Sequence, residues 1–169
     1  MTSLPHDLQI TQAQPSDRQD VVAFVMQARA QMFPMLDPRA MPDDVQHFET
    51  AYCACDGGLF LLARQAGVLV GTIGWLPYDG RFAQLDYSGR KVVEVVRLFI
   101  APCARRAGIA ARLFESLKNA AVERGVEVLY LHTHPFLPGA IPFWQRQGFA
   151  IVDTENDPVW QTTHMQRAL

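Results

Sequence analysis

Arg105 and Arg106 stand next to Gly108 in a short loop, a composition that suits the binding of a phosphate group. The run before the loop, Val92–Ile100, is apolar and β-branched, so it predicts a buried strand. After the loop the apolar residues change to helical spacing, at Ile109, Leu113, Phe114, Leu117, Ala120 and Ala121. The first backbone N–H groups of such a helix have no partner within it and lie at its positive end. The loop is therefore expected to bind a phosphorylated ligand.

Two well-known phosphate-binding motifs do not match this loop. A Walker A loop needs G-x-x-x-x-G-K-[ST], which occurs nowhere in the sequence, and a dinucleotide fingerprint needs three glycines where this loop has one. The loop matches [QR]-x-x-G-x-[GA] instead, through Arg105, Gly108 and Ala110.

This loop, with its neighbours, resembles a known family. The strand Glu94–Ile100 is followed by Ala-Pro and then by the loop, and the later run Ala140–Phe149 reads A-I-P-F-W-Q-R-Q-G-F. Together they resemble the GNAT superfamily of acyl-CoA-dependent N-acyltransferases, over the C-terminal half of the chain. The resemblance implies an acetyltransferase that uses acetyl-CoA as co-substrate and transfers the acetyl group to a primary amine by direct attack in a ternary complex.

The resemblance also implies the fold. We expect an α/β (α+β) protein with one GNAT-like domain over residues 1–169, whose mixed, mostly antiparallel sheet is splayed at its centre and flanked by helices on both faces. Periodicity gives the same order of elements, β-α-α-β-β-β-α-β-α-β-β. The expected strands are 8–13, 59–64, 68–76, 92–100, 126–133, 149–154 and 160–169, and the expected helices begin near residues 15, 43, 109 and 138.

The family resemblance assigns cofactor contacts by position. The pantetheine arm of acetyl-CoA would pair with the backbone at the end of the strand as an added strand does. The pyrophosphate would accept hydrogen bonds from N–H groups 106–110, with Arg105 and Arg106 nearby, and Gly108 would allow close approach. The alternative is that the two arginines are solvated residues at a helix start. The predicted cofactor-binding residues are Leu98, Phe99, Ile100, Arg105, Arg106, Ala107, Gly108, Ile109, Ala110, Phe143 and Trp144.

Glu94 is the candidate catalytic residue. A carboxylate inside a run of valines is costly unless it is paired or functional. If burial raises its pKa, Glu94 could take a proton from the acceptor amine, directly or through water, and the matching position is a general base in some GNAT members. The alternative is a structural ion pair with Arg97, Arg90 or Lys91. Simple alternation places Glu94 with Val96, Leu98 and Ile100 on one face, and Val93, Val95, Arg97 and Phe99 on the other.

The chain departs from the family at Trp144, where the usual residue is the tyrosine that serves as general acid. An indole cannot protonate a leaving thiolate, so the acid role is vacant or filled from elsewhere, with Tyr130, His132, Thr133 and His134 as candidates. A thiolate can leave without a strong acid. The substitution keeps open a second class of function, a non-catalytic module that binds CoA or acyl-CoA.

The pair His132-x-His134 has no third ligand at fixed spacing, so we expect no metal site. A histidine that lines the acceptor pocket and one that is hydrogen-bonded at a strand end both remain open. Three cysteines do not predict a disulfide framework, and Cys53 and Cys55 are expected to pack on a helix.

Three loops are expected to form the acceptor site by family resemblance: Met32–Met41, Pro77–Gly89 and Glu155–Val159. Their aromatic side chains and carboxylates suit a small-molecule amine that carries a positive charge. A protein N-terminus or lysine is the alternative acceptor.

Composition argues against several partners. A net charge of −2 and a pI near 6.2 give no support for nucleic acid or an anionic membrane. The sequence has no apolar stretch long enough to span a bilayer, and residues 1–7 lack the pattern of a signal peptide. We therefore expect a cytoplasmic protein, with a homodimer left open.

Overall fold

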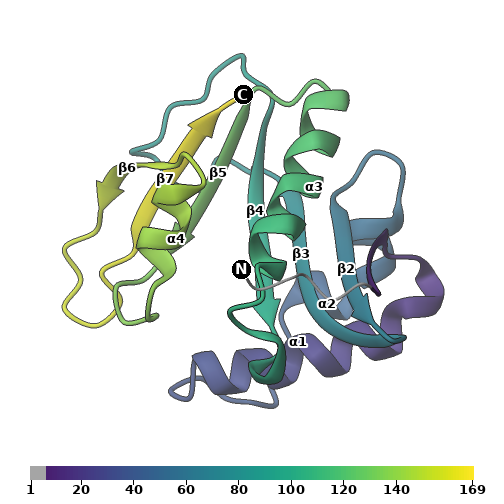
Figure 1. Cartoon of the computed structure of the whole chain (residues 1–169). Coiled ribbons are helices and arrows are strands. Elements are labelled where there is room, and N and C mark those ends of the chain that lie inside the picture. The colour runs from purple at the N-terminus through teal and green to yellow at the C-terminus, as the bar shows by residue number, and fades with distance from the viewer. Residues whose placement is uncertain (1–6) are drawn as a thin grey trace. The chain divides into compact units, whose positions relative to one another are not determined.

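A computed structural model describes residues 7–169, and its elements follow the order expected from the sequence (Figure 1). Residues 1–6, with most of the segment tested for a signal peptide, lie outside this description. In chain order the elements are β1 Leu8–Gln12, α1 Arg18–Met32, α2 Asp43–Gln46, β2 Leu59–Gln65, β3 Val68–Pro77, β4 Val92–Ile100, α3 Ile109–Glu123, β5 Val128–Thr133, α4 Ala140–Arg146, β6 Ala150–Thr154 and β7 Thr163–Ala168. The single helix expected from residue 43 to 54 is wrong: α2 stops at Gln46, and a π-helical turn, Glu49–Cys53, follows.

The strands pair in the order β1-β2-β3-β4-β5-β7-β6. β1 with β2, β2 with β3, β5 with β7 and β6 with β7 are antiparallel, whereas β4 and β5 are parallel. The expected mixed, mostly antiparallel sheet is therefore confirmed. The pairs between β4 and β5 run from Val92↔Val128 to Glu94↔Tyr130, although β4 continues to Ile100 and β5 to Thr133.

The described chain forms two compact units. The first holds the residues up to Leu76 together with Val96–Asn119, and the second holds Pro77–Val95 and Ala120–Leu169. β4 contributes Val92–Val95 to the second unit and its remainder to the first.

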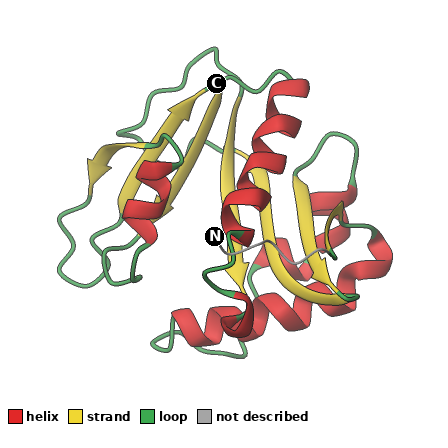
Figure 2. Ribbon diagram, viewed as in Figure 1, coloured by secondary structure: helices red, strands yellow, loops and turns green. Residues whose placement is uncertain are grey.

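Helices cover both faces of the strands in the first unit (Figure 2). On one face, α1 and the π-helical turn bury an apolar cluster that includes Val21, Val25, Phe48, Tyr52, Phe60, Leu62 and Phe99. On the other face α3 lies so close to β3 that a Cβ on Gly71 would be 2.9 Å from Ile100 and 3.1 Å from Leu113. Glycine at position 71 thus allows α3 to pack directly on the strands.

A residue in the middle of β4 breaks its regular alternation. Arg97 has φ +57°, a left-handed conformation that non-glycine residues seldom adopt in a strand. As a result Val96 and Phe99, three residues apart, both pack on the cluster beneath α1, whereas Ile100 faces Gly71 and α3. The expected grouping of Val96 with Ile100 on one face is therefore wrong, because it assumed an uninterrupted strand.

In the second unit, the loop Pro77–Gly89 packs onto the side of the strands that carries Val92, Val128 and Tyr130. Its aromatic side chains include Tyr78, whose ring centroid is 4.9 Å from that of Tyr130, and Phe82, which is 4.6 Å from His164. The loop Pro77–Gly89, which was predicted as part of the acceptor site, therefore also contributes side chains to a core.

Candidate active site

The predicted phosphate loop has the backbone that its sequence suggests. β4 ends at Ile100, a 3-10 turn spans Pro102–Ala104, and α3 begins at Ile109. Gly108, directly before α3, has φ +74°, and Arg106 has φ +65°. Arg105 and Arg106 are both exposed. The Nε of Arg105 donates a 3.3 Å hydrogen bond to the carbonyl of Ile100. The loop thus brings two cations to the positive end of a helix, which favours an anionic ligand.

The other predicted cofactor residues differ in what they could offer. The side chain of Phe99 is 7% exposed and belongs to the core beneath α1, so only its backbone could contact a ligand. Leu98 and Ile100 are half-buried. Trp144, on α4, is buried, and its ring packs edge-on against Phe143 and Phe149 at 5.0 and 5.2 Å.

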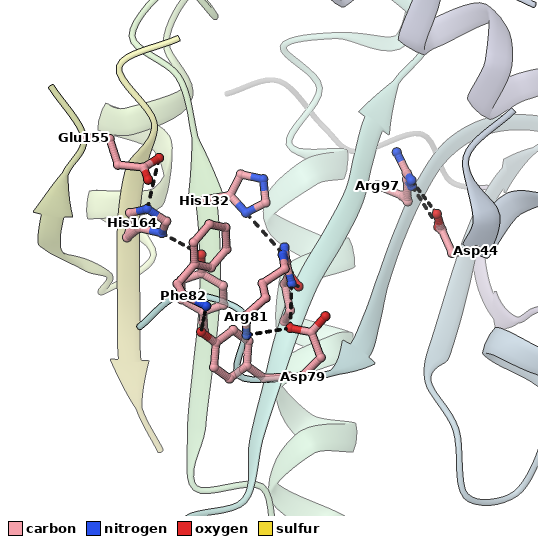
Figure 3. Close-up of polar contacts among 11 residues, drawn as sticks. Asp44, Asp79, Arg81, Phe82, Arg97, His132, Glu155 and His164 are labelled. Atoms are coloured by element: carbon pink, nitrogen blue, oxygen red, sulfur yellow. Dashed lines mark hydrogen bonds and ion pairs between the residues drawn. The ribbon is translucent and has the colours of Figure 1, made fainter. Parts of the chain in front are cut away.

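Glu94 is buried and fully engaged in ion pairs. The guanidinium of Arg81 donates to both of its oxygens, from Nη2 to Oε1 at 2.7 Å and from Nη1 to Oε2 at 2.8 Å (Figure 3). His132 Nδ1 lies 3.1 Å from the same Oε1. Only 6% of the Glu94 side chain is exposed. This is the bidentate geometry that binds a carboxylate most strongly.

These partners reverse the pKa shift expected for Glu94. Burial alone raises the pKa of a carboxyl group, but here the contacts with His132 and Arg81 outweigh it and lower the pKa to about 2. The expectation of a raised pKa is therefore wrong. The expected partners Arg97, Arg90 and Lys91 are also not those of Glu94: its cation is Arg81, thirteen residues earlier on the loop.

Sequence reasoning did not single out Arg81. Its Nη1 also contacts Asp79 at 3.0 Å, and its guanidinium lies 4.6 Å from the ring centroid of Phe82. No periodicity connects a loop residue to a strand residue thirteen positions later. The one available signal was the D-G-R-F sequence, which places a cation between a carboxylate and an aromatic ring.

The three histidines of this unit have distinct environments. His164 is fully buried, and its Nδ1 is hydrogen-bonded to the Tyr130 hydroxyl at 2.7 Å, while its Nε2 lies 3.5 Å from Glu155. His134 is 9% exposed, and its Nδ1 is 3.1 Å from the carbonyl of Trp160. Burial lowers the pKa of both His134 and His164. His132 differs, because 31% of its side chain is exposed.

Arg97, at the interruption of β4, pairs with Asp44 at the start of α2. Its Nη2 and Nε lie 2.6 and 3.0 Å from the two carboxylate oxygens, and Figure 3 shows this pair. The Tyr52 hydroxyl also donates to Asp44 at 2.6 Å. Burial raises the pKa of Asp44, but the hydrogen bond and charge of Arg97 lower it overall. Burial also raises the pKa of Tyr52. The buried ion pair holds the segment after the loop Met32–Met41 against β4.

Within residues 7–169 no group of three or more His, Cys, Asp or Glu side chains is arranged to hold a metal ion. Cys53 is half-buried and packs beside the apolar cluster under α1, as expected. Cys55 is exposed and lies beyond the π-helical turn, so its expected packing role is wrong. None of the described helices has both the length and the apolar character needed to cross a membrane.

Comparison with known proteins identifies the family. The model of the acetyltransferase (GNAT) family matches residues 22–149. An "IAA acetyltransferase" of Azospirillum brasilense is 35% identical over 91 residues, which are 54% of each chain. The chain spans about half the length of the curated relatives that it matches.

Solved structures agree on the fold. An acetyltransferase of the GNAT family from Staphylococcus aureus Mu50 superimposes with a TM-score of 0.75 and 20% identity, over 95% of this chain and 98% of that one. The PaiA N-acetyltransferase of Thermoplasma acidophilum, solved in complex with coenzyme A, gives a TM-score of 0.71 and 14% identity, over 96% and 99%. The fold and the match of residues 22–149 to the family model are those of an acyltransferase. The chain belongs to the GNAT family of acetyltransferases.

Proposed function

We propose that this protein is an N-acetyltransferase that moves an acetyl group from acetyl-CoA to a primary amine by direct attack in a ternary complex. The observation that carries the proposal is the loop Arg105–Ala110, with a left-handed Gly108 at the start of α3, in a chain of the GNAT family. Coenzyme A in the related Thermoplasma structure supports acetyl-CoA as the co-substrate.

Acetyl-CoA is proposed to bind mainly through two segments of the chain. Backbone N–H groups 106–110 and the side chains of Arg105 and Arg106 would bind the pyrophosphate. The backbone of Leu98, Phe99 and Ile100 would pair with the pantetheine arm. Ala107, Ile109, Phe143 and Trp144 complete the proposed set of cofactor-binding residues.

Glu94 stays the proposed catalytic carboxylate. An amine is mostly protonated at neutral pH and must lose a proton before it attacks a thioester. In this proposal Glu94 serves that proton transfer, directly or through water.

The proposed acceptor is a small-molecule amine. The cluster of Arg81, Asp79 and Glu94 carries two negative charges and one positive charge, and aromatic rings line the same loop. A net negative, aromatic environment favours a cationic amine. Acetylation of a protein amine is the alternative.

Four further expectations remain predictions: a cytoplasmic location, a homodimer, the absence of nucleic acid or membrane partners, and a single domain over residues 1–169.

Thiol release from acetyl-CoA across a panel of small amines and peptides tests the function, and calorimetry with acetyl-CoA tests binding separately. Turnover of a small amine at a rate above that of a peptide supports the proposal. Binding of acetyl-CoA without turnover of any amine would indicate the non-catalytic module that Trp144 left open. No binding would reject both.

A further inference from the structure

His132 and Glu94 are brought together by the pairing of two neighbouring strands. Glu94 on β4 pairs in register with Tyr130 on β5, and His132 follows Tyr130 by two residues. Side chains two residues apart on a strand point to the same face. His132 therefore lies on the face that carries Glu94, and its Nδ1 is 3.1 Å from Oε1.

The surroundings of Glu94 suit it to hold a histidine rather than to accept a proton itself. Both of its oxygens already accept hydrogen bonds from Arg81. A carboxylate held as an anion in this way is a weak base. It can still accept a hydrogen bond from an imidazole N–H and so fix which ring nitrogen carries the proton.

Among the residues that the structure describes, Glu94 is the partner of opposite charge at the buried edge of His132. The Nδ1 of His132 is buried and faces this carboxylate, although the contact is not a well-aligned hydrogen bond. Such contacts are often loose without substrate and tighten when it binds. Because a carboxylate can only accept, the proton of a neutral ring belongs on Nδ1, and the lone pair then lies on Nε2. The ring as a whole is 31% exposed, so its accessible part lies away from Nδ1.

Other described side chains that lie around His132 are less suited to act as the base. Phe82 on the loop, Tyr130 and His134 on β5, and His164 on β7 have ring centroids 5.9 to 6.3 Å away. His164 is fully buried with Nδ1 bonded to Tyr130, and His134 Nδ1 lies at the carbonyl of Trp160. The charge of Arg81 is balanced by Glu94 and Asp79.

We propose that His132 is the catalytic base of the reaction and that Glu94 is its positioning residue, an inference that rests on the proposed function. Nε2 of His132 takes a proton from the acceptor ammonium and releases it to solvent. The amine nitrogen then forms the C–N bond with the acetyl carbon, and the C–S bond breaks. The second proton on nitrogen passes to the departing thiolate, so the products are the acetamide and CoA.

Three variants and a control test this assignment. His132→Gln and the smaller His132→Asn should lower kcat by roughly 10²-fold, the usual scale for a lost base, with unchanged acetyl-CoA affinity. In both, the plateau of rate against pH should disappear. Glu94→Gln should lower kcat less and keep a plateau. His47→Gln removes an exposed histidine from α2's end and should behave as wild type.

A measurement without turnover tests the pairing itself. In NMR spectra of ¹⁵N-histidine-labelled protein, neutral His132 should carry its proton on Nδ1, and Glu94→Gln should shift the proton toward Nε2. If wild type turns over no amine, the proposed function fails, and this spectrum still decides the pairing: a proton on Nε2 of wild-type His132 overturns it. If turnover occurs and His132→Gln keeps the wild-type pH profile, the base is Glu94 or water and the inference is wrong.

Discussion

The hydroxyl of Thr72 donates a 2.8 Å hydrogen bond to the backbone carbonyl of Arg97, the residue at which β4 takes its left-handed turn. The same residue pairs through its side chain with Asp44. Arg97 is thus held at both backbone and side chain, which explains how a non-glycine residue stays in a conformation that costs on the order of 1 kcal/mol or more.

Arg97→Ala should destabilise the protein by about 3 kcal/mol, because it leaves the mostly buried Asp44 without its cation. Arg97→Gly loses the same ion pair but relieves the positive φ, so it should be more stable than the alanine variant by about 1 kcal/mol. Urea unfolding of both measures the difference. Adding Asp44→Asn to Arg97→Ala should recover part of the loss. Equal stability of the glycine and alanine variants would show that the backbone at Arg97 is not strained.

Gly108→Glu should abolish acetyl-CoA binding measured by calorimetry, because it places bulk and negative charge at the start of α3. Gly125→Glu is the matched control. Gly125 follows the other end of α3, has a similar φ of +71°, and has nothing near the position of a Cβ. Both variants bear the same backbone strain, so equal affinity in the two would place the cofactor away from the loop.

Glu94 should make stability depend on pH. Its folded pKa is about 2 against an ordinary value of 4.5, so the stabilisation is present above pH 4.5 and is lost as pH falls toward 2. The contribution is on the order of 3 kcal/mol. The stability difference between wild type and Glu94→Gln should therefore shrink across this range. Glu115→Gln, at an exposed residue of α3, provides the control, and a pH-independent difference at Glu94 would show that its ion pair does not form.

Trp144→Tyr should reduce stability or acetyl-CoA affinity by about 1 kcal/mol or more, because the indole is packed between Phe143 and Phe149. Thermal unfolding and calorimetry measure the two effects. A several-fold gain in kcat with intact affinity would instead mean that the new hydroxyl protonates the leaving sulfur.

The parts of the molecule that local sequence determines were predictable. The bounds of β4 were predicted without error, and α3 begins at the predicted Ile109, because long apolar patterns of one period dominate those segments. Glu94 was recognised because a charge in a run of valines needs a partner.

What the sequence could not reveal depends on contacts between distant residues. The pairing of Glu94 with Arg81 requires the loop Pro77–Gly89 to fold over the strand, and the left-handed turn at Arg97 depends on Thr72 and Asp44. Neither leaves a periodic signal. The predicted direction of the pKa shift of Glu94 was wrong for the same reason, because its burial could be predicted and its partners could not.

The position of β7 has a consequence for biosynthesis. β6 is made before β7, yet it pairs with β7, which also lies against β5. During translation β5 and β6 therefore leave the ribosome before the strand that joins them. The second unit can complete its sheet only when Thr163–Ala168 has emerged, so a nascent chain that stalls earlier would expose two unpaired strand edges to chaperones and aggregation.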